Sequence, residues 1–260
     1  MDEPETEIEA EAEPAETADA EPAEKPASTA AAAAANDIAS EQARGRRDEL
    51  IDPIEETLAR QLKRVLQDEQ NEVLDRLRRK RRRQNGSALL SADEQAGRFR
   101  EAAEPVLEDA VRAGARFADP RGETRLNPGR GREVALGLAR EIAEPLRKRL
   151  ETTLADAPQD GDRDGAELSE MVSAVYRQWR AQDLEPLVRH HVTVAFGRGA
   201  YAAYEDGVTL KWVVDDDAPC PDCDDNALAG AVEKGQPYPT GQAHPPAHPG
   251  CRCLLVPSIS

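Results

Sequence analysis

The four cysteines of this chain lie in two close pairs near its C-terminal end, and the rest of the 260 residues contains none. Two residues separate Cys220 from Cys223, and one separates Cys251 from Cys253. The segment around them, from about residue 207 onward, is rich in Pro, Gly and Asp and poor in large apolar side chains. A unit of about 50 residues with so little apolar core rarely folds without a cross-link. The cysteine pairs therefore constrain this part of the chain more than any other feature.

The spacing of the cysteines favours a metal ion as that cross-link. A two-residue spacer lets the thiolates of Cys220 and Cys223 bind one ion at about 2.3 Å, and tetrahedral zinc needs four donors. The candidate ligands are Cys220, Cys223, His248, Cys251 and Cys253, with His244 as a weaker sixth. A site of four thiolates and a site of three thiolates plus one imidazole both fit this pattern. We predict one structural zinc ion.

Other roles for the cysteines fit the sequence less well. Met1 to Glu13 is acidic and has no apolar stretch, so we expect no secretory signal and a reducing cytoplasm, where clustered cysteines bind metal rather than form disulfides. Unrelated buried cysteines would not gather in two pairs. A nucleophilic cysteine needs a positioned histidine base, and the second close cysteine argues against that role.

A catalytic zinc would keep one open position with a general base beside it. No acidic residue of the segment is singled out for that role, and we predict no enzymatic activity. We interpret the nearby acidic residues as an exposed rim: Asp215, Asp216, Asp217, Asp222, Asp224 and Asp225.

Acidic charge is concentrated at the N-terminus. Residues 1–40 hold twelve Asp or Glu and one Lys, which leaves −6 of the net charge of −17 for the remaining 220 residues. Repeated Pro, self-repelling charge and the near absence of large apolar residues predict disorder, although Ala30–Ala35 could be transiently helical. We extend this disordered tail to residue 47. No apolar stretch approaches the roughly 18–20 residues of a membrane span, so no membrane association is expected.

Residues 48–206 have the apolar spacing of helices. In residues 48–83 apolar side chains recur every three or four positions, interrupted at Glu69, and predict one long helix. The string Ser91-Ala-Asp-Glu94 is typical of a capping box and predicts a second helix to about Phe117. Asn127-Pro128 predicts the start of a third.

Prolines suggest where these helices end. Pro105 is expected to split the second helix, Pro145 to kink or end the third, and Glu185-Pro186 to separate a fourth helix from a fifth that runs to Gly207. Residues 208–214 have strand-like spacing, and short strands at most are expected afterwards. The prediction is a mainly α fold with a disordered acidic tail (1–47), a helical domain (48–206) and a small zinc-stabilised α+β, loop-rich module (207–260).

Six consecutive cations close the long helix: Arg78, Arg79, Lys80, Arg81, Arg82 and Arg83. Such a run can bind phosphates without sequence preference. A solvated helix end is the plainer reading, because cations favour the C-terminal end of the helix dipole. The acidic tail folding back onto the run is a third. The His190-His191 pair is interpreted as a surface or core pair, and Gly197-Arg-Gly199 is too short for a phosphate loop.

The C-terminal quarter resembles a known family. Lys211-Trp212, Cys220-Pro-Asp-Cys223 and Pro245-Pro-Ala-His248-Pro-Gly-Cys251-Arg-Cys253 are similar to the end of the Mu F-like minor head proteins of tailed phages, also called phage head morphogenesis proteins. The similarity covers about residues 196–257. Leu228-Ala-Gly230 stands where the family has an Asn-Gly or Asp-Gly turn.

The resemblance implies a structural role in the virion. It implies a minor head protein that is assembled in the host cytoplasm, lies inside the head, and contacts the portal or capsid during head morphogenesis and DNA packaging or delivery. Non-specific contact with packaged DNA through residues 78–83 would fit that location. The main alternative is a zinc-binding nucleic-acid-binding protein that uses the same basic run. A metal-dependent nuclease or head-maturation protease comes third, because the sequence shows no Ser/His/Asp or His-Asn-His constellation.

Overall fold

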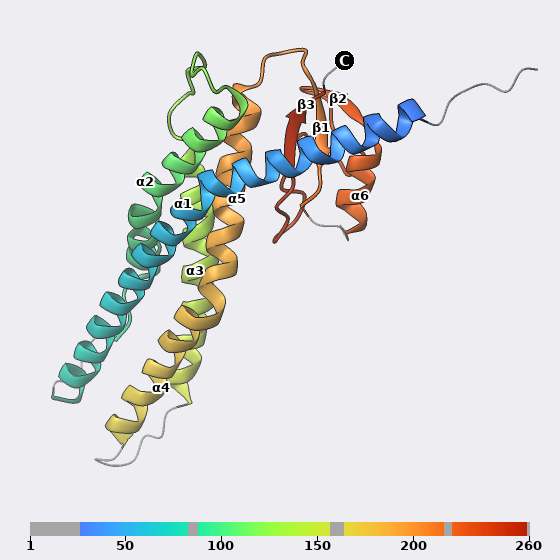
Figure 1. Cartoon of the computed structure of the whole chain (residues 1–260). Helices are drawn as coiled ribbons and strands as arrows, with labels where there is room; N and C mark the ends of the chain where they lie inside the picture. The colour runs from blue at the N-terminus through green and yellow to red at the C-terminus, as the bar shows by residue number, and fades with distance from the viewer. Residues whose placement is uncertain (1–26, 83–87, 157–163, 216–219, 259–260) are drawn as a thin grey trace, which may run out of the picture. The chain divides into compact units, whose positions relative to one another are not determined.

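The chain is mainly α-helical with a small antiparallel sheet toward its C-terminal end, as the sequence predicted (Figure 1). In this computed structural model the described residues are 27–82, 88–156, 164–215 and 220–258, without the side chains of residues 27–36, 80–82 and 164. The helices are α1 (Ala27–Arg82), α2 (Ala92–Ala118), α3 (Arg130–Ala155), α4 (Asp164–Gln178), α5 (Leu184–Ala203) and α6 (Pro221–Leu228). The strands are β1 (Thr209–Val213), β2 (Ala231–Glu233) and β3 (Leu254–Pro257).

Helix α1 begins at Ala27, well before the predicted start at residue 48. The part of the predicted disordered tail that is described, residues 27–47, is therefore helical, and residues 1–26 lie outside the description. The alanine run continues a helix that is already formed downstream, so it does not bear the cost of nucleation alone. Contacts divide the chain into two compact units, Met1–Ala39 and Ser40–Ser260, and the division falls inside α1.

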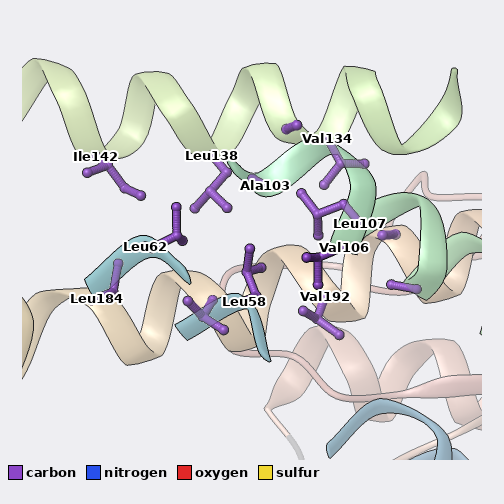
Figure 2. Close-up of a cluster of buried hydrophobic side chains, with 14 of the residues drawn as sticks. Leu58, Leu62, Ala103, Val106, Leu107, Val134, Leu138, Ile142, Leu184 and Val192 are labelled. Carbon is purple, nitrogen blue, oxygen red and sulfur yellow. The ribbon is translucent and has the colours of Figure 1, made fainter. Parts of the chain in front are cut away.

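Helices α2, α3 and α5 pack against one another and form the centre of the second unit (Figure 1). Apolar side chains from all three, together with Leu58 and Leu62 of α1, meet in one cluster (Figure 2). Two glycines bring α2 and α5 into close contact. A Cβ at Gly114 would lie 1.9 Å from the carbonyl oxygen of Phe196, and one at Gly199 would lie 2.0 Å from that of Val111. Gly199 is thus a helix-packing residue.

Ser91 caps α2 as predicted, while the Glu94 carboxylate of the predicted capping box pairs with Arg98. The helix ends predicted at the prolines are wrong. The Ser91 hydroxyl accepts a hydrogen bond from the backbone N–H of Glu94 at 3.2 Å. Helix α2 continues through Pro105 and α3 through Pro145 to Ala155. Between α4 and α5 the backbone stays helical through a π-helical turn, Trp179–Asp183, that precedes Pro186. A π turn shifts the hydrogen-bond ladder by one residue, which lets the chain accommodate the missing N–H without ending the helix.

Glu69, which interrupts the apolar stripe of α1, is buried rather than exposed. One of its carboxylate oxygens accepts hydrogen bonds from Gln95 Nε2 at 2.6 Å and from the Tyr176 hydroxyl at 2.8 Å. Burial raises the pKa of Glu69, and the two hydrogen bonds only partly offset that rise. This polar contact joins α1 to α2 and α4 inside the apolar core.

The sheet has the strand order β2-β1-β3, and both neighbours of β1 are antiparallel to it. Its central strand is the one predicted at residues 208–214. Trp212 pairs with Leu255 across the sheet, and the Tyr204 hydroxyl at the end of α5 donates to the Leu255 carbonyl at 2.7 Å. Buried residues of the sheet and of the helices belong to one continuous core. The predicted boundary at residue 207 therefore does not separate two compact units.

Among the described helices, none combines the length and apolar character needed to cross a membrane.

Candidate metal centre

The first cysteine pair is positioned by the start of α6. Cys220 is the N-cap residue of this helix, with an extended backbone, and Pro221 occupies the first turn. The backbone N–H of Cys223 donates to Cys220 Sγ at 3.4 Å. The N-cap geometry thus turns both sulfur atoms toward the same side, as a Cys-x-x-Cys metal site requires.

The second half of the site is the loop that leads into β3. The backbone N–H of Cys251 donates to the His248 carbonyl at 3.1 Å and closes a turn. His248 Nδ1 lies 2.9 Å from the Pro249 carbonyl oxygen, which can only accept, so Nδ1 carries the proton. The other ring nitrogen, Nε2, is therefore unprotonated, and its lone pair can bind a metal ion.

Five side chains converge at this point. His248 Nε2 lies 3.0 Å from Cys220 Sγ and 3.4 Å from Cys223 Sγ. Cys223 Sγ lies 3.6 Å from Cys251 Sγ. The donor atoms form two triads, Cys220–Cys223–His248 and Cys223–Cys251–Cys253, and within each triad the three donor atoms lie within 4.8 Å of one another. Cys223 belongs to both triads, and all four cysteines are free thiols.

This arrangement fits a tetrahedral metal ion. Two thiolates at about 2.3 Å from a zinc ion lie roughly 3.8 Å apart, close to the separation of Cys223 and Cys251. The cluster of Cys223, His248, Cys251 and Cys253, with Cys220 beside it, could thus hold a metal ion. Three of these cysteines are buried, and only Cys220 is partly exposed, which is typical of a closed site.

The acidity of the thiols differs across the cluster. The pKa of Cys251 is lowered to about 5 by the hydrogen bond between Cys251 and Cys253 and by the backbone N–H groups of Ala247 and Cys253. The backbone N–H of Cys223 lowers the pKa of Cys220. Burial raises the pKa of Cys223 to about 12. The hydrogen bond to Cys251, and then burial, raise the pKa of Cys253. Cys251 is thus the thiol that ionises most readily, and a bound cation would favour deprotonation of Cys223.

His244, the weaker candidate ligand, lies outside the metal-binding groups of the described residues. Its Nδ1 faces the Pro245 carbonyl oxygen at 2.7 Å, and its ring lies 4.9 Å from that of Tyr201. It packs the loop against α5. Neither His190 nor His191 belongs to the metal-binding groups of the described residues. His190 lies beside the cluster and lines a pocket with Cys251, whereas His191 is buried with Nε2 3.2 Å from Glu141 Oε2.

The predicted acidic rim is only partly correct. Asp222, Asp224 and Asp225 on α6 are exposed, and Asp216 and Asp217 lie outside the described residues. Asp215 is not a rim residue, because its carboxylate pairs with the buried guanidinium of Arg47 at 2.5 Å. A buried cation requires such a partner, which the charge pattern of the sequence alone did not reveal.

The basic run lies mostly outside the description. Arg78 pairs with Asp75 at 3.0 Å, and Arg79 is exposed. The side chains of Lys80, Arg81 and Arg82, and all of Arg83, are not described. DNA binding by this run therefore stays a prediction.

Comparisons of the chain with known protein families, with curated proteins and with solved structures found no match.

Proposed function

We propose that Cys220, Cys223, His248 and Cys251 bind one structural zinc ion. The convergence of these donors around Cys223 carries the proposal. Cys253 is then a thiol that donates a hydrogen bond to the Cys251 thiolate, in keeping with the opposite directions of their pKa shifts. With four protein ligands no position is left for substrate, so the ion stabilises the fold and performs no catalysis.

Zinc at this place would supply what the segment lacks in apolar core. Binding free energies in zinc peptides are on the order of 10 kcal/mol, and that energy is folding free energy when the unfolded chain has no preformed site. The ion would join the α6 end of the segment to the loop that leads into β3. The ion would thus cross-link the segment that follows β1 to the segment that precedes β3.

Elemental analysis of the full chain, purified under reducing conditions, tests the site. About one zinc per chain is expected for the wild type and for Cys253→Ser. Cys223→Ser and His248→Ala should each lose most of the metal, whereas His244→Ala is a matched control that should keep it. A wild type without zinc, or a Cys253→Ser variant that loses zinc like Cys223→Ser, would contradict this assignment.

The whole chain is proposed to be a structural protein of a phage or prophage head, similar to the Mu F-like minor head proteins. The string from Pro245 to Cys253 supports this, because it is the part of the chain that resembles the family and also supplies half of the metal cluster. Its partners would be portal or capsid proteins, with non-specific contact to packaged DNA, inside the virion head.

Mass spectrometry of purified particles produced by the genome that encodes this chain tests the role. A few copies per particle are expected, together with co-purification with the portal protein when the two are co-expressed. Absence of the chain from particles that contain portal and capsid proteins would overturn the assignment and leave the zinc site untouched.

A further inference from the structure

Arg252 lies between two cysteines of the metal cluster and points away from it. The side chains of Cys251 and Cys253 share one triad, whereas the guanidinium of Arg252 contacts carboxylates of α1. In extended backbone successive side chains point to opposite sides. One short segment therefore faces the metal centre with two residues and α1 with the residue between them.

The contacts of Arg252 with α1 are close and partly buried. Its Nη1 lies 2.9 Å from Glu55 Oε1, and its Nη2 lies 2.9 Å from Asp48 Oδ1 and 3.8 Å from Asp52 Oδ1. These carboxylates recur every three or four residues and so occupy one face of α1. Burial raises the pKa of Glu55, and Arg252 opposes that rise. Arg252 thus supplies the main counter-charge for this face.

Arg47 of α1 makes the reciprocal contact. Its side chain is 2% exposed, and it donates hydrogen bonds to the backbone carbonyl of Arg252 and to Asp215, which follows β1. It also pairs with Asp48 at 2.8 Å. Both contacts depend on the position of residue 252, because Arg47 binds its backbone carbonyl and the Arg252 side chain binds the carboxylates of α1.

We propose that metal binding holds the segment 44–55 of α1 in place through Arg252, as a metal-dependent clamp. This rests on the zinc site proposed above. A bound ion fixes the backbone of residues 248–253 and with it the acceptor of Arg47 and the direction of Arg252. Without the ion the loop relaxes, Arg47 loses its acceptor at the Arg252 carbonyl while keeping Asp48 and Asp215, and Glu55 loses its close ion pair with Arg252. A buried charge without a partner is strongly unfavourable, so the charged face of the segment loosens and Glu55 returns to water, although Ile51 on the same segment is fully buried in the core.

The rest of α1 does not depend on this clamp. Leu58, Leu62 and Leu66 are fully buried in the helical core. Leu58 and Leu62 meet side chains of α2, α3 and α5 there (Figure 2). The effect of metal removal should therefore stop near residue 58. A graded response along one helix is the signature of the clamp.

Hydrogen exchange of the full chain, read by mass spectrometry, tests the clamp. Amides of residues 44–55 should exchange at least tenfold faster after zinc is removed by a chelator, while those of 62–77 stay unchanged. Arg252→Gln and Glu55→Gln should show the same local increase with one zinc still bound. Arg189→Gln is the matched control, because this exposed arginine also faces Glu55, at 3.7 Å, but comes from α5.

Three results would overturn the clamp, and zinc content measured on the same samples separates them. If one zinc is lost and faster exchange is confined to residues 207–257, the zinc site stands and the clamp is wrong. If Arg252→Gln and Glu55→Gln leave residues 44–55 protected, Arg252 is not the link. If the wild type never binds zinc, the proposed zinc function and the metal dependence fail together.

Discussion

Around Leu138, apolar side chains of α1, α2, α3 and α5 fill a continuous cluster (Figure 2). Cys223 belongs to the same core but also lies 3.4 Å from His248 Nε2 and 3.6 Å from Cys251 Sγ. Both places belong to the same compact unit. The helical region can be stable through burial alone, because each large apolar side chain that is fully buried contributes about 1.5–3 kcal/mol. The C-terminal region shares this apolar core and adds polar contacts that need specific partners, and we propose a metal ion as one of those partners.

Within the helical region, the largest effect of a single substitution should come from the apolar core. Leu138→Ala removes a fully buried side chain and should lower the free energy of unfolding by about 2–5 kcal/mol. Leu136→Ala is the matched control on the same helix, because Leu136 is exposed, and it should cost less than about 0.5 kcal/mol. Urea unfolding followed by circular dichroism measures both. Equal losses for the two variants would show that the core is not where we place it.

A smaller effect on stability is expected from the buried carboxylate of Glu69, and it should depend on pH. Because the folded-state pKa of Glu69 is raised, the native state holds this proton more tightly, and its contribution to stability falls as pH rises above 4.5. Glu69→Gln should remove that decline, which can reach about 1.4 kcal/mol per pH unit for one proton. Urea unfolding of wild type and variant between pH 4 and pH 8 measures the difference.

Glu72, on the same helix, is the control with the opposite sign. Arg98 and Arg76 hold the pKa of Glu72 below its usual range, so its contribution is present at neutral pH and is lost as pH falls through the acidic range. Glu72→Gln should therefore flatten the acidic side of the stability profile only. The same pH profile for both variants would contradict the burial of Glu69 between α1, α2 and α4.

The smallest effect on stability should come from the basic run, because Arg78 and Arg79, its two described side chains, are exposed. Replacing residues 78–83 with Ser and Gln should leave unfolding nearly unchanged and weaken binding to duplex DNA. Three or four neutralised phosphates predict a log–log salt slope of about −3 to −4 for the wild type. Fluorescence anisotropy at several salt concentrations tests this, with Arg125→Gln/Arg132→Gln as a control at two exposed arginines elsewhere in the chain. Undiminished binding by the substituted run would leave it as a solvated helix end.

Much of this architecture could be predicted from the sequence because it follows from local rules. The apolar spacing around Leu138 predicted α3, Ser91 predicted the start of α2, and the two cysteine pairs predicted the metal cluster. The family resemblance stays a prediction.

What the sequence did not predict depends on contacts between distant segments. A proline ends an isolated helix, but packing and a π turn carried the chain past Pro105, Pro145 and Pro186. The roles of Arg47 and Arg252 also required the fold, because their partners lie about 170 to 200 residues away along the chain. The sequence feature that could have pointed to Arg252 is its position between two candidate metal ligands, Cys251 and Cys253.

The two tryptophans of the chain allow a direct test of the contrast between the regions. Trp179 belongs to the helical region, and Trp212 lies in the sheet beside the metal cluster. A Trp179→Phe variant makes fluorescence report on Trp212 alone, while far-ultraviolet circular dichroism reports on the helices. Removing zinc from this variant should shift the Trp212 emission to the red and retain most of the helical signal, and adding zinc back should reverse the shift. A Trp212 emission that is indifferent to zinc, or a helical signal that collapses with it, would contradict the account.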